Sequence, residues 1–221
     1  MNNDSALQQA VQAELGWEPS VIAAHIGVAA KSGVVTLTGY VENYASKFAA
    51  ESAARRVKGV KAVAEEIEVK LPFSIKRNDD DIAAAALQRL AWDVAVPVDA
   101  VKVKVEKGWV TLTGEVAWHY EQEAAGEDVR RLYGVVGVSN LISIKPEVDV
   151  LNISDDITHA LHRSWNFDPQ TIRVSAKNGK VKLTGTARSP HDRRTAALTA
   201  WSAPGVTAVE NDITVDAPGV G

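Results

Sequence analysis

The sequence contains no cysteine. This absence excludes disulfide bonds, thiolate metal sites and thiol catalysis, but it does not distinguish a reducing from an oxidising compartment. Long apolar runs are also missing, because polar residues interrupt every hydrophobic patch well before the roughly 20 residues needed to cross a bilayer. The chain is therefore expected to be soluble, or at most peripheral to a membrane.

An excess of positive charge is absent as well. The chain has 24 Lys and Arg against 28 Asp and Glu, a net charge of −4. It therefore has no global positive field to attract nucleic acid, and no nucleic-acid partner is expected. The N-terminus lacks the pattern of a secretory leader. As given, the sequence predicts a cytoplasmic location, or a periplasmic one if a leader has been removed.

One eight-residue phrase, in contrast, is present three times. The copies are SGVVTLTG at 32–39, KGWVTLTG at 107–114 and NGKVKLTG at 178–185. Another glycine follows 20 residues after the end of each copy, at Gly59, Gly134 and Gly205. Equal intervals of this kind indicate three copies of one unit. The repeat period is longer than that of most solenoids, so three separate domains are predicted.

Each unit is predicted to begin with a helix. Apolar residues recur at every fourth position and so share one helical face. They are Leu7, Val11 and Leu15; Ile82, Ala86 and Leu90; and Ile157, Leu161 and Trp165. Asp4, Asp79 and Ser154 stand three residues before these faces begin, where a side-chain oxygen can accept from free backbone N–H groups. We therefore expect these three residues to cap the helices.

Two strands joined by a tight turn follow this helix. Alternating apolar and polar residues predict a half-buried strand before each phrase. The first glycine of the phrase closes a hairpin, most clearly at Asn178–Gly179, since both residues tolerate positive φ. The rest of the phrase is a second strand. Its last glycine, Gly39, Gly114 or Gly185, is expected to end that strand and release the chain from the sheet.

A second helix and a third strand complete each unit. A right-handed crossover makes the second and third strands parallel. The sequence therefore predicts an α+β protein of three tandem αββαβ domains, each a mixed three-stranded sheet with two helices packed on one face. We place these domains at residues 1–71, 78–146 and 152–216.

The combination of a helix with a leading Asp, a strand, "G.V.LTG" and "GV..V.N.I.V" resembles the BON domain, named for bacterial osmotically inducible and nodulation proteins. All three units carry it. The second and third units have the Asn of the last strand, Asn140 and Asn211, whereas the first has Glu65. The resemblance implies non-catalytic modules that bind phospholipid surfaces or other hydrophobic or polymeric ligands. It implies no cofactor and no catalytic residues.

Catalytic or metal-binding patterns are weak. His159 and His162 are three residues apart on a predicted helix, with Asp155 or Asp156 as a third ligand, but solvated helix-face histidines are the simpler interpretation. The acidic run at 78–81 opens a helix, where carboxylates complement free N–H groups. The sequence has no phosphate loop, zinc-protease helix or nucleophile elbow. We expect neither a metal site nor an enzyme.

Two arginine pairs are the best basic feature. Arg55 and Arg56 recur as Arg130 and Arg131 at the end of the second helix in the first two units. They are candidates for contact with lipid phosphates, where each basic residue contributes about 1 kcal/mol. Cations placed at a helix C-terminus for their effect on the dipole, worth roughly 0.3–1 kcal/mol, are the simpler interpretation.

The aromatic residues divide into two groups. Trp17, Trp92 and Phe167 occupy one repeated position and are predicted to pack in the domain interior. Trp109, at an outward strand position, and Trp118, in the loop after the phrase, belong to the second unit alone. Outward tryptophans of this kind are candidate ligand contacts, although packing between domains explains them equally well.

Two functions remain open on the sequence. The first is a non-catalytic tandem binding module, related to osmotic or other stress, that associates with anionic phospholipid or envelope surfaces through Arg55, Arg56, Arg130, Arg131, Trp109 and Trp118. The alternative is a cytoplasmic protein-interaction scaffold or chaperone-like protein that binds other proteins through the open sheet faces or through the aromatic positions of the second unit.

Overall fold

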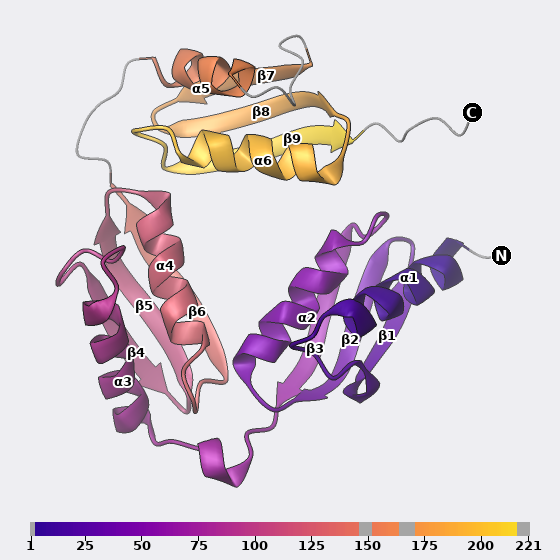
Figure 1. Ribbon diagram of the computed structural model, residues 1–221, viewed down its shortest axis with the longest axis vertical. Coiled ribbons are helices and arrows are strands. Elements are labelled where there is room, and N and C mark those ends of the chain that lie inside the picture. The colour runs from indigo at the N-terminus through magenta and orange to yellow at the C-terminus, as the bar shows by residue number, and fades with distance from the viewer. Residues whose placement is uncertain (1–2, 146–151, 164–170, 216–221) are drawn as a thin grey trace. The chain divides into compact units, whose positions relative to one another are not determined.

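The computed structural model of the chain describes residues 3–145, 152–163 and 171–215. Within these ranges the backbone forms three separate three-stranded sheets, which Figure 1 shows with their helices. Each sheet belongs to one of the three repeated units.

The first unit contains two helices and three strands in the predicted order. Its elements are α1 (Asn3–Trp17), the short 3-10 helix η1 (Ala23–His25), β1 (Ile26–Lys31), β2 (Val34–Val41), α2 (Tyr44–Arg56) and β3 (Ala62–Val69). A second 3-10 helix, η2 (Phe73–Ile75), follows in the segment before the next unit.

The second and third units repeat this order. The second comprises α3 (Asp79–Trp92), β4 (Val101–Glu106), β5 (Trp109–Val116), α4 (His119–Arg130) and β6 (Gly137–Ile144). The third comprises α5 (Ile153–His162), β7 (Ile172–Lys177), β8 (Lys180–Ala187), α6 (Pro190–Trp201) and β9 (Ala208–Val215).

The middle strand of each sheet comes from the repeated phrase. β1 runs antiparallel to β2, and β2 runs parallel to β3, with the long crossover through α2 between them. The third sheet has the same pairing, so that Gly39 and Gly185 each face an isoleucine on both neighbouring strands. The middle sheet has the order β4-β5-β6. The predicted α+β class, with mixed three-stranded sheets, is confirmed.

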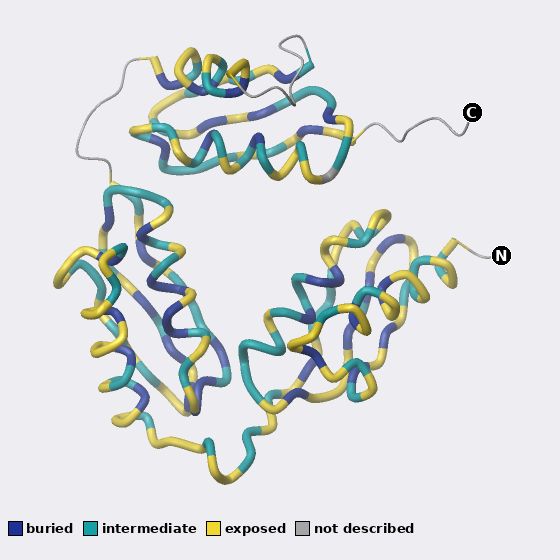
Figure 2. The backbone as a smooth tube through the Cα atoms, in the orientation of Figure 1, coloured by how far each residue is buried: buried dark blue, intermediate teal, exposed yellow. Residues whose placement is uncertain are grey.

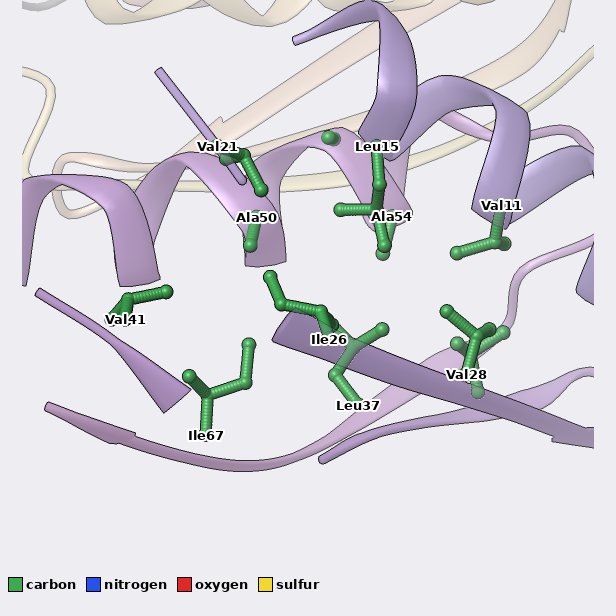
Figure 3. Close-up of a cluster of buried hydrophobic side chains, with 12 residues drawn as sticks. Val11, Leu15, Val21, Ile26, Val28, Leu37, Val41, Ala50, Ala54 and Ile67 are labelled. Carbon is green, nitrogen blue, oxygen red and sulfur yellow. The ribbon is translucent and has the colours of Figure 1, made fainter. Parts of the chain in front are cut away.

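The core of each described unit lies between its helices and one face of its sheet. Figure 3 shows this for the first unit, where side chains from α1 and α2 point toward those of the three strands. The contributors are Val11 and Leu15 from α1, Ala50 and Ala54 from α2, Ile26 and Val28 from β1, Leu37 from β2, and Ile67 from β3. Figure 2 shows buried and exposed positions alternating along the strands. The predicted helical faces are buried except at Leu7, which is partly buried, and Trp165 lies outside the described residues.

The hairpin of each unit closes in a turn with two consecutive left-handed residues. Their φ angles are 53° and 86° at Ser32 and Gly33, 52° and 78° at Lys107 and Gly108, and 51° and 74° at Asn178 and Gly179. Two adjacent residues of positive φ define the type I′ turn, whose twist matches that of the flanking strands. The predicted hairpin is therefore confirmed.

The glycine that ends the phrase has a different role from the one expected. Gly39 does not end its strand, because β2 continues to Val41. Its φ is 118°, and a Cβ atom placed on it would collide with the backbone carbonyl oxygen of His25. The same collision would occur between Gly114 and the carbonyl oxygen of Ala100, and between Gly185 and that of Thr171. The prediction was wrong because the constraint is a close approach of two backbone segments, which strand periodicity does not reveal.

The repeated aspartate also has a different role. Asp4 Oδ1 accepts a hydrogen bond from the backbone N–H of Ser32 at 2.8 Å. The Asp79 carboxylate accepts from the N–H groups of Lys107 at 2.7 Å and Gly108 at 2.8 Å. These residues therefore tie the start of the first helix to the hairpin turn, some 28 residues away.

The three predicted caps lie inside their helices rather than before them. Asn78 caps α3, since its Oδ1 accepts from the N–H of Asp81 at 2.7 Å. Asp79 is the first residue of its helix, and Asp4 and Ser154 are the second residues of theirs, whereas a cap requires the non-helical position before the helix.

Replacement of Gly39 by alanine should test the backbone approach. We expect Gly39→Ala to destabilise the first domain by about 3 kcal/mol or more, because it adds both a steric collision and an unfavourable φ. Amide hydrogen exchange in β1 and β2 of the full chain should then accelerate at least about a hundredfold.

Gly16→Ala is the matched control, since nothing lies within 4 Å of a Cβ atom at Gly16. In a helix this change should leave stability unaltered or raise it by up to about 1 kcal/mol. Equal effects of the two substitutions would contradict the proposed contact.

Candidate surface-binding site

The arginine pair of the first unit lies in the last turn of α2, as predicted. Arg55 is paired with Glu51 one turn earlier, with Nη2 to Oε1 at 2.6 Å. Arg56 reaches across to α1 and pairs with Glu14 at 3.1 Å and Glu18 at 3.3 Å. Both guanidinium groups stay accessible, and exposed ion pairs of this kind contribute only about 0–1 kcal/mol. They can therefore exchange these partners for an external anion at low cost.

One of these acidic partners is held in its charged form. The hydrogen bond from the Ser20 hydroxyl to Glu18, at 2.9 Å, is the main reason that the pKa of Glu18 is lowered, and Arg56 lowers it further. The carboxylate of Glu18 therefore stays ionised at neutral pH and below. The charge of Arg56 is balanced locally under these conditions.

The second arginine pair is placed similarly. Arg130 is the last residue of α4 and is half-buried, and Arg131 follows directly and is exposed. Arg131 has Glu127 one turn earlier, at 3.9 Å, and both side chains are well exposed. The structure thus places both predicted pairs at the helix end where a cation also complements the helix dipole.

The repeated tryptophans lie on the surface, which corrects the prediction that they pack in the interior. Trp17 is 84% exposed and Trp92 is 81% exposed. The reason is helical geometry. Each follows the last buried residue of its helix, Leu15 or Leu90, by two positions, and two residues turn a helix by about 200°, to the opposite side. Phe167, at the third equivalent position, lies outside the described residues.

Exposed apolar residues follow each of these tryptophans. In the loop after Trp92, Val94 and Val98 are almost fully exposed. In the loop after Trp17, Ile22 is about half exposed. The end of the first helix and the loop beyond it therefore form an apolar tip in two of the units. We call the tip at Trp17 and Ile22, and that at Trp92, Val94 and Val98, the aromatic tips.

Trp109 begins β5 and faces outward, as predicted. Its indole Nε1–H donates to the hydroxyl of Ser139 on β6 at 2.9 Å. The side chain is 47% exposed, so one part of the ring is covered and the remainder is accessible.

Trp118 is half-buried and stands directly before α4. The Glu121 side chain accepts hydrogen bonds from the backbone N–H groups of Trp118, at 3.0 Å, and Ala117, at 2.9 Å, an arrangement typical of the capping box. Tyr120 is exposed beside it, and its pKa is raised, mainly by desolvation and further by the Glu121 carboxylate. The local contacts of Trp118 are thus those of a helix start.

The Asn of the last strand belongs to a polar latch that joins the second helix to that strand. In the second unit, Asn140 Nδ2 donates to the carbonyl oxygen of Gln122 at 2.7 Å, while the Gln122 amide donates to the carbonyl oxygen of Ile142. In the third unit, Asn211 donates to the carbonyl oxygen of Arg193 at 3.0 Å, and Arg193 donates back to the carbonyl oxygen of Asn211 at 3.0 Å.

The first unit builds the latch from a different pair. Lys47 donates to the carbonyl oxygen of Ile67 at 2.7 Å and pairs with Glu65 at 2.9 Å. Both side chains of this ion pair are largely covered. The first unit thus has Glu65 where the other units have Asn. It also has a lysine where they have Gln122 and Arg193, so the second helix and the last strand remain joined.

Across residues 3–145, 152–163 and 171–215, no three His, Cys, Asp or Glu side chains gather closely enough to hold a metal ion. In the same part of the chain, no helix combines the length and the apolar character that crossing a membrane requires.

These features define a class of protein: tandem copies of one small α+β domain, each built on the same hairpin turn, close backbone approach and helix-to-strand latch. The sequence profile of the BON domain matches residues 3–70, 78–146 and 149–217. The chain therefore belongs to the BON domain family.

One characterised relative is the osmotically-inducible protein Y of Escherichia coli strain K12. It is 31% identical to this chain over 147 residues, which cover 65% of this chain and 73% of the relative. Among solved structures, CdsD, a structural protein of the type III secretion system of Chlamydia trachomatis, aligns over 96% of this chain and 92% of its own, at 16% identity and a TM-score of 0.26. Its C-terminal domain gives a TM-score of 0.27 at 15% identity.

The latch can be tested by converting the first unit to the residues of the second. Lys47→Gln alone leaves the Glu65 carboxylate without its cation, and Glu65→Asn alone leaves Lys47 without its anion. We expect each to destabilise the first domain by about 1 kcal/mol. The double variant recreates the Gln and Asn pair of the second unit and should recover most of this loss in urea unfolding. Additive losses in the double variant would contradict the latch.

Proposed function

We propose that this protein is a non-catalytic tandem binding module that associates with anionic phospholipid surfaces and acts in the response to osmotic stress. The observation that carries the proposal is the exposure of Trp17 and Trp92 at one repeated position. Exposed tryptophan is costly in water and is favoured at the boundary between headgroups and acyl chains, where its apolar body and its N–H are both satisfied.

The aromatic tips have the composition expected for shallow insertion. Each places a tryptophan and at least one exposed aliphatic residue at a helix end and the adjoining loop. An aromatic side chain buries about 150–250 Å² when fully covered. At about 25 cal/mol per Å², half of that area corresponds to roughly 2–3 kcal/mol per tryptophan, which is enough for reversible attachment.

Arginines supply the electrostatic part of the proposal. Arg131 is exposed, and its contact with Glu127 is long. Arg55 and Arg56 are accessible but paired. We therefore assign them a secondary role, in which lipid phosphates compete with glutamates for the guanidinium groups. This contribution should be screened by salt, whereas the contribution of the aromatic tips should not.

Repetition and relatives support the same proposal. Linked weak sites can raise the overall affinity about 10² to 10⁴-fold without any new contact, which gives a physical purpose to three copies of one domain. The name of the Escherichia coli relative describes that protein as osmotically inducible. By analogy, we propose that this protein accumulates on osmotic upshift.

Co-sedimentation with vesicles tests the lipid proposal. The full chain should sediment with phosphatidylglycerol-containing vesicles at low salt and only partly dissociate at high salt. The double variant Trp17→Ala/Trp92→Ala should bind at least about tenfold more weakly, since about 1.4 kcal/mol is tenfold in affinity.

Trp118→Ala is the matched control, because Trp118 is half-buried and lies outside the aromatic tips. It should bind as the unsubstituted chain does, with circular dichroism confirming that all variants are folded. No sedimentation of the unsubstituted chain at low salt would refute the proposal and would favour the alternative of a protein-interaction scaffold.

A further inference from the structure

The second unit carries a flat aromatic surface that neither the fold nor the lipid proposal uses. A Cβ atom placed on Gly137 would collide with the Cε3, Cζ3 and Cδ2 atoms of the Trp109 ring. On a strand, the Cβ of an outward residue points away from the sheet. The indole therefore lies across the outer face of Gly137, with one side against the backbone and the other toward solvent.

Burial supports this geometry. Gly137 is buried, although it stands on the open side of the sheet, whereas its counterpart Ala62 in the first unit is exposed. The hydrogen bond from Trp109 Nε1–H to Ser139 Oγ, at 2.9 Å, fixes the ring in this orientation. The ring is thus held in place before any ligand arrives, which lowers the entropy cost of binding.

Three residues of the second unit that differ from their counterparts in the other two units create this surface. Trp109, Gly137 and Ser139 stand where the first unit has Val34, Ala62 and Ala64 and the third has Lys180, Ala208 and Glu210. A methyl group at position 137 would prevent the ring from lying flat, and Ser139 supplies the acceptor for its N–H. The flat position of the ring therefore depends on all three residues together. A tryptophan that only packed against the surface would need neither the glycine nor the serine.

Polar side chains that donate or accept hydrogen bonds stand on the outward side of β4 and β5. Thr111 follows Trp109 on the same face of β5, two residues along the strand. Lys104 and Glu106, on the outward side of β4, are exposed and pair with each other at 3.0 Å. The outward side of β4 and β5 therefore offers hydroxyl, ammonium and carboxylate groups, and Lys104 is paired with an anion.

We propose that Trp109, Gly137 and Ser139 form a binding platform for neutral oligosaccharides. A sugar ring has an apolar C–H face that stacks on an indole and a rim of hydroxyl groups that hydrogen-bond to mixed donors and acceptors. Lys104 and Glu106 together add no net charge, so this pair gives no preference for a polyanion over a neutral ligand. A ring lying flat on a sheet is also unsuited to membrane insertion, unlike the aromatic tips.

Titration of the full chain with cellohexaose, chitohexaose and maltohexaose tests the proposal, with the Trp109 indole N–H signal followed by nuclear magnetic resonance. At least one hexasaccharide should shift this signal with a Kd of the order of 1 mM, a value suited to a shallow single-ring site. Trp109→Ala lacks this indole and is followed instead by the backbone amide signals of β5 and β6; it should weaken binding at least about tenfold.

Gly137→Ala is the sharper variant, because it keeps the tryptophan but displaces the ring, and alanine is tolerated at this position in both other units. It should weaken binding as Trp109→Ala does while the fold is retained. Trp92→Ala should leave saccharide binding unchanged. Three results would overturn the proposal. The first is that no hexasaccharide shifts the signal at about 10 mM, which is about ten times the expected Kd, and the second is that binding survives in Gly137→Ala. The third is that a proline-rich peptide, titrated in parallel, shifts the signal while no hexasaccharide does.

Discussion

Each domain of this protein depends on one close approach of backbone to backbone. The glycine near the end of the central strand passes the carbonyl that precedes the first strand with no room for a side chain. This approach allows the central strand to continue and pair with both neighbours, which completes a sheet of only three strands. A sheet this narrow can be covered on one face by two helices, and the small residues of the second helix, such as Ala50 and Ala54, let it sit close. The latch that binds the second helix to the last strand also stabilises each domain, and in the first two domains an aspartate binds the hairpin turn.

Much of the fold could be predicted from the sequence, because three copies of one pattern separate shared constraints from local variation. Helical faces such as that of Val11 and Leu15 follow from periodicity alone. The turn at Asn178 and Gly179 follows from the residues that tolerate positive φ. The roles of Gly39 and Asp79 could not be predicted in this way. Both residues contact backbone groups that lie more than ten residues away in the sequence. A local pattern does not show which distant backbone group a side chain will bind, or which one leaves no room for a Cβ atom.

The candidate site was less predictable than the fold. Trp17 and Trp92 recur, and recurrence in a small domain suggests core packing, yet both lie on the surface. Counting the angle around the helix from Leu15 would have placed Trp17 on the far side, so this signal was available in the sequence. The orientation of the Trp109 ring could not be predicted from the sequence. Only the structure shows that the glycine on a neighbouring strand makes room for the ring. The outward position of Trp109 was predicted, but its partner Gly137 could not be recognised from alternation alone.

Shared buried residues and glycines thus build each domain, and exposed tryptophans are the side chains to which we assign binding. The most direct test of this account is the set of tryptophan indole N–H signals of the full chain, assigned by single substitutions, in the presence of bicelles that contain phosphatidylglycerol. The account predicts that the signals of Trp17 and Trp92 shift or broaden first, while that of Trp118 does not change. Unchanged signals for Trp17 and Trp92, under conditions where the protein binds the bicelles, would contradict it.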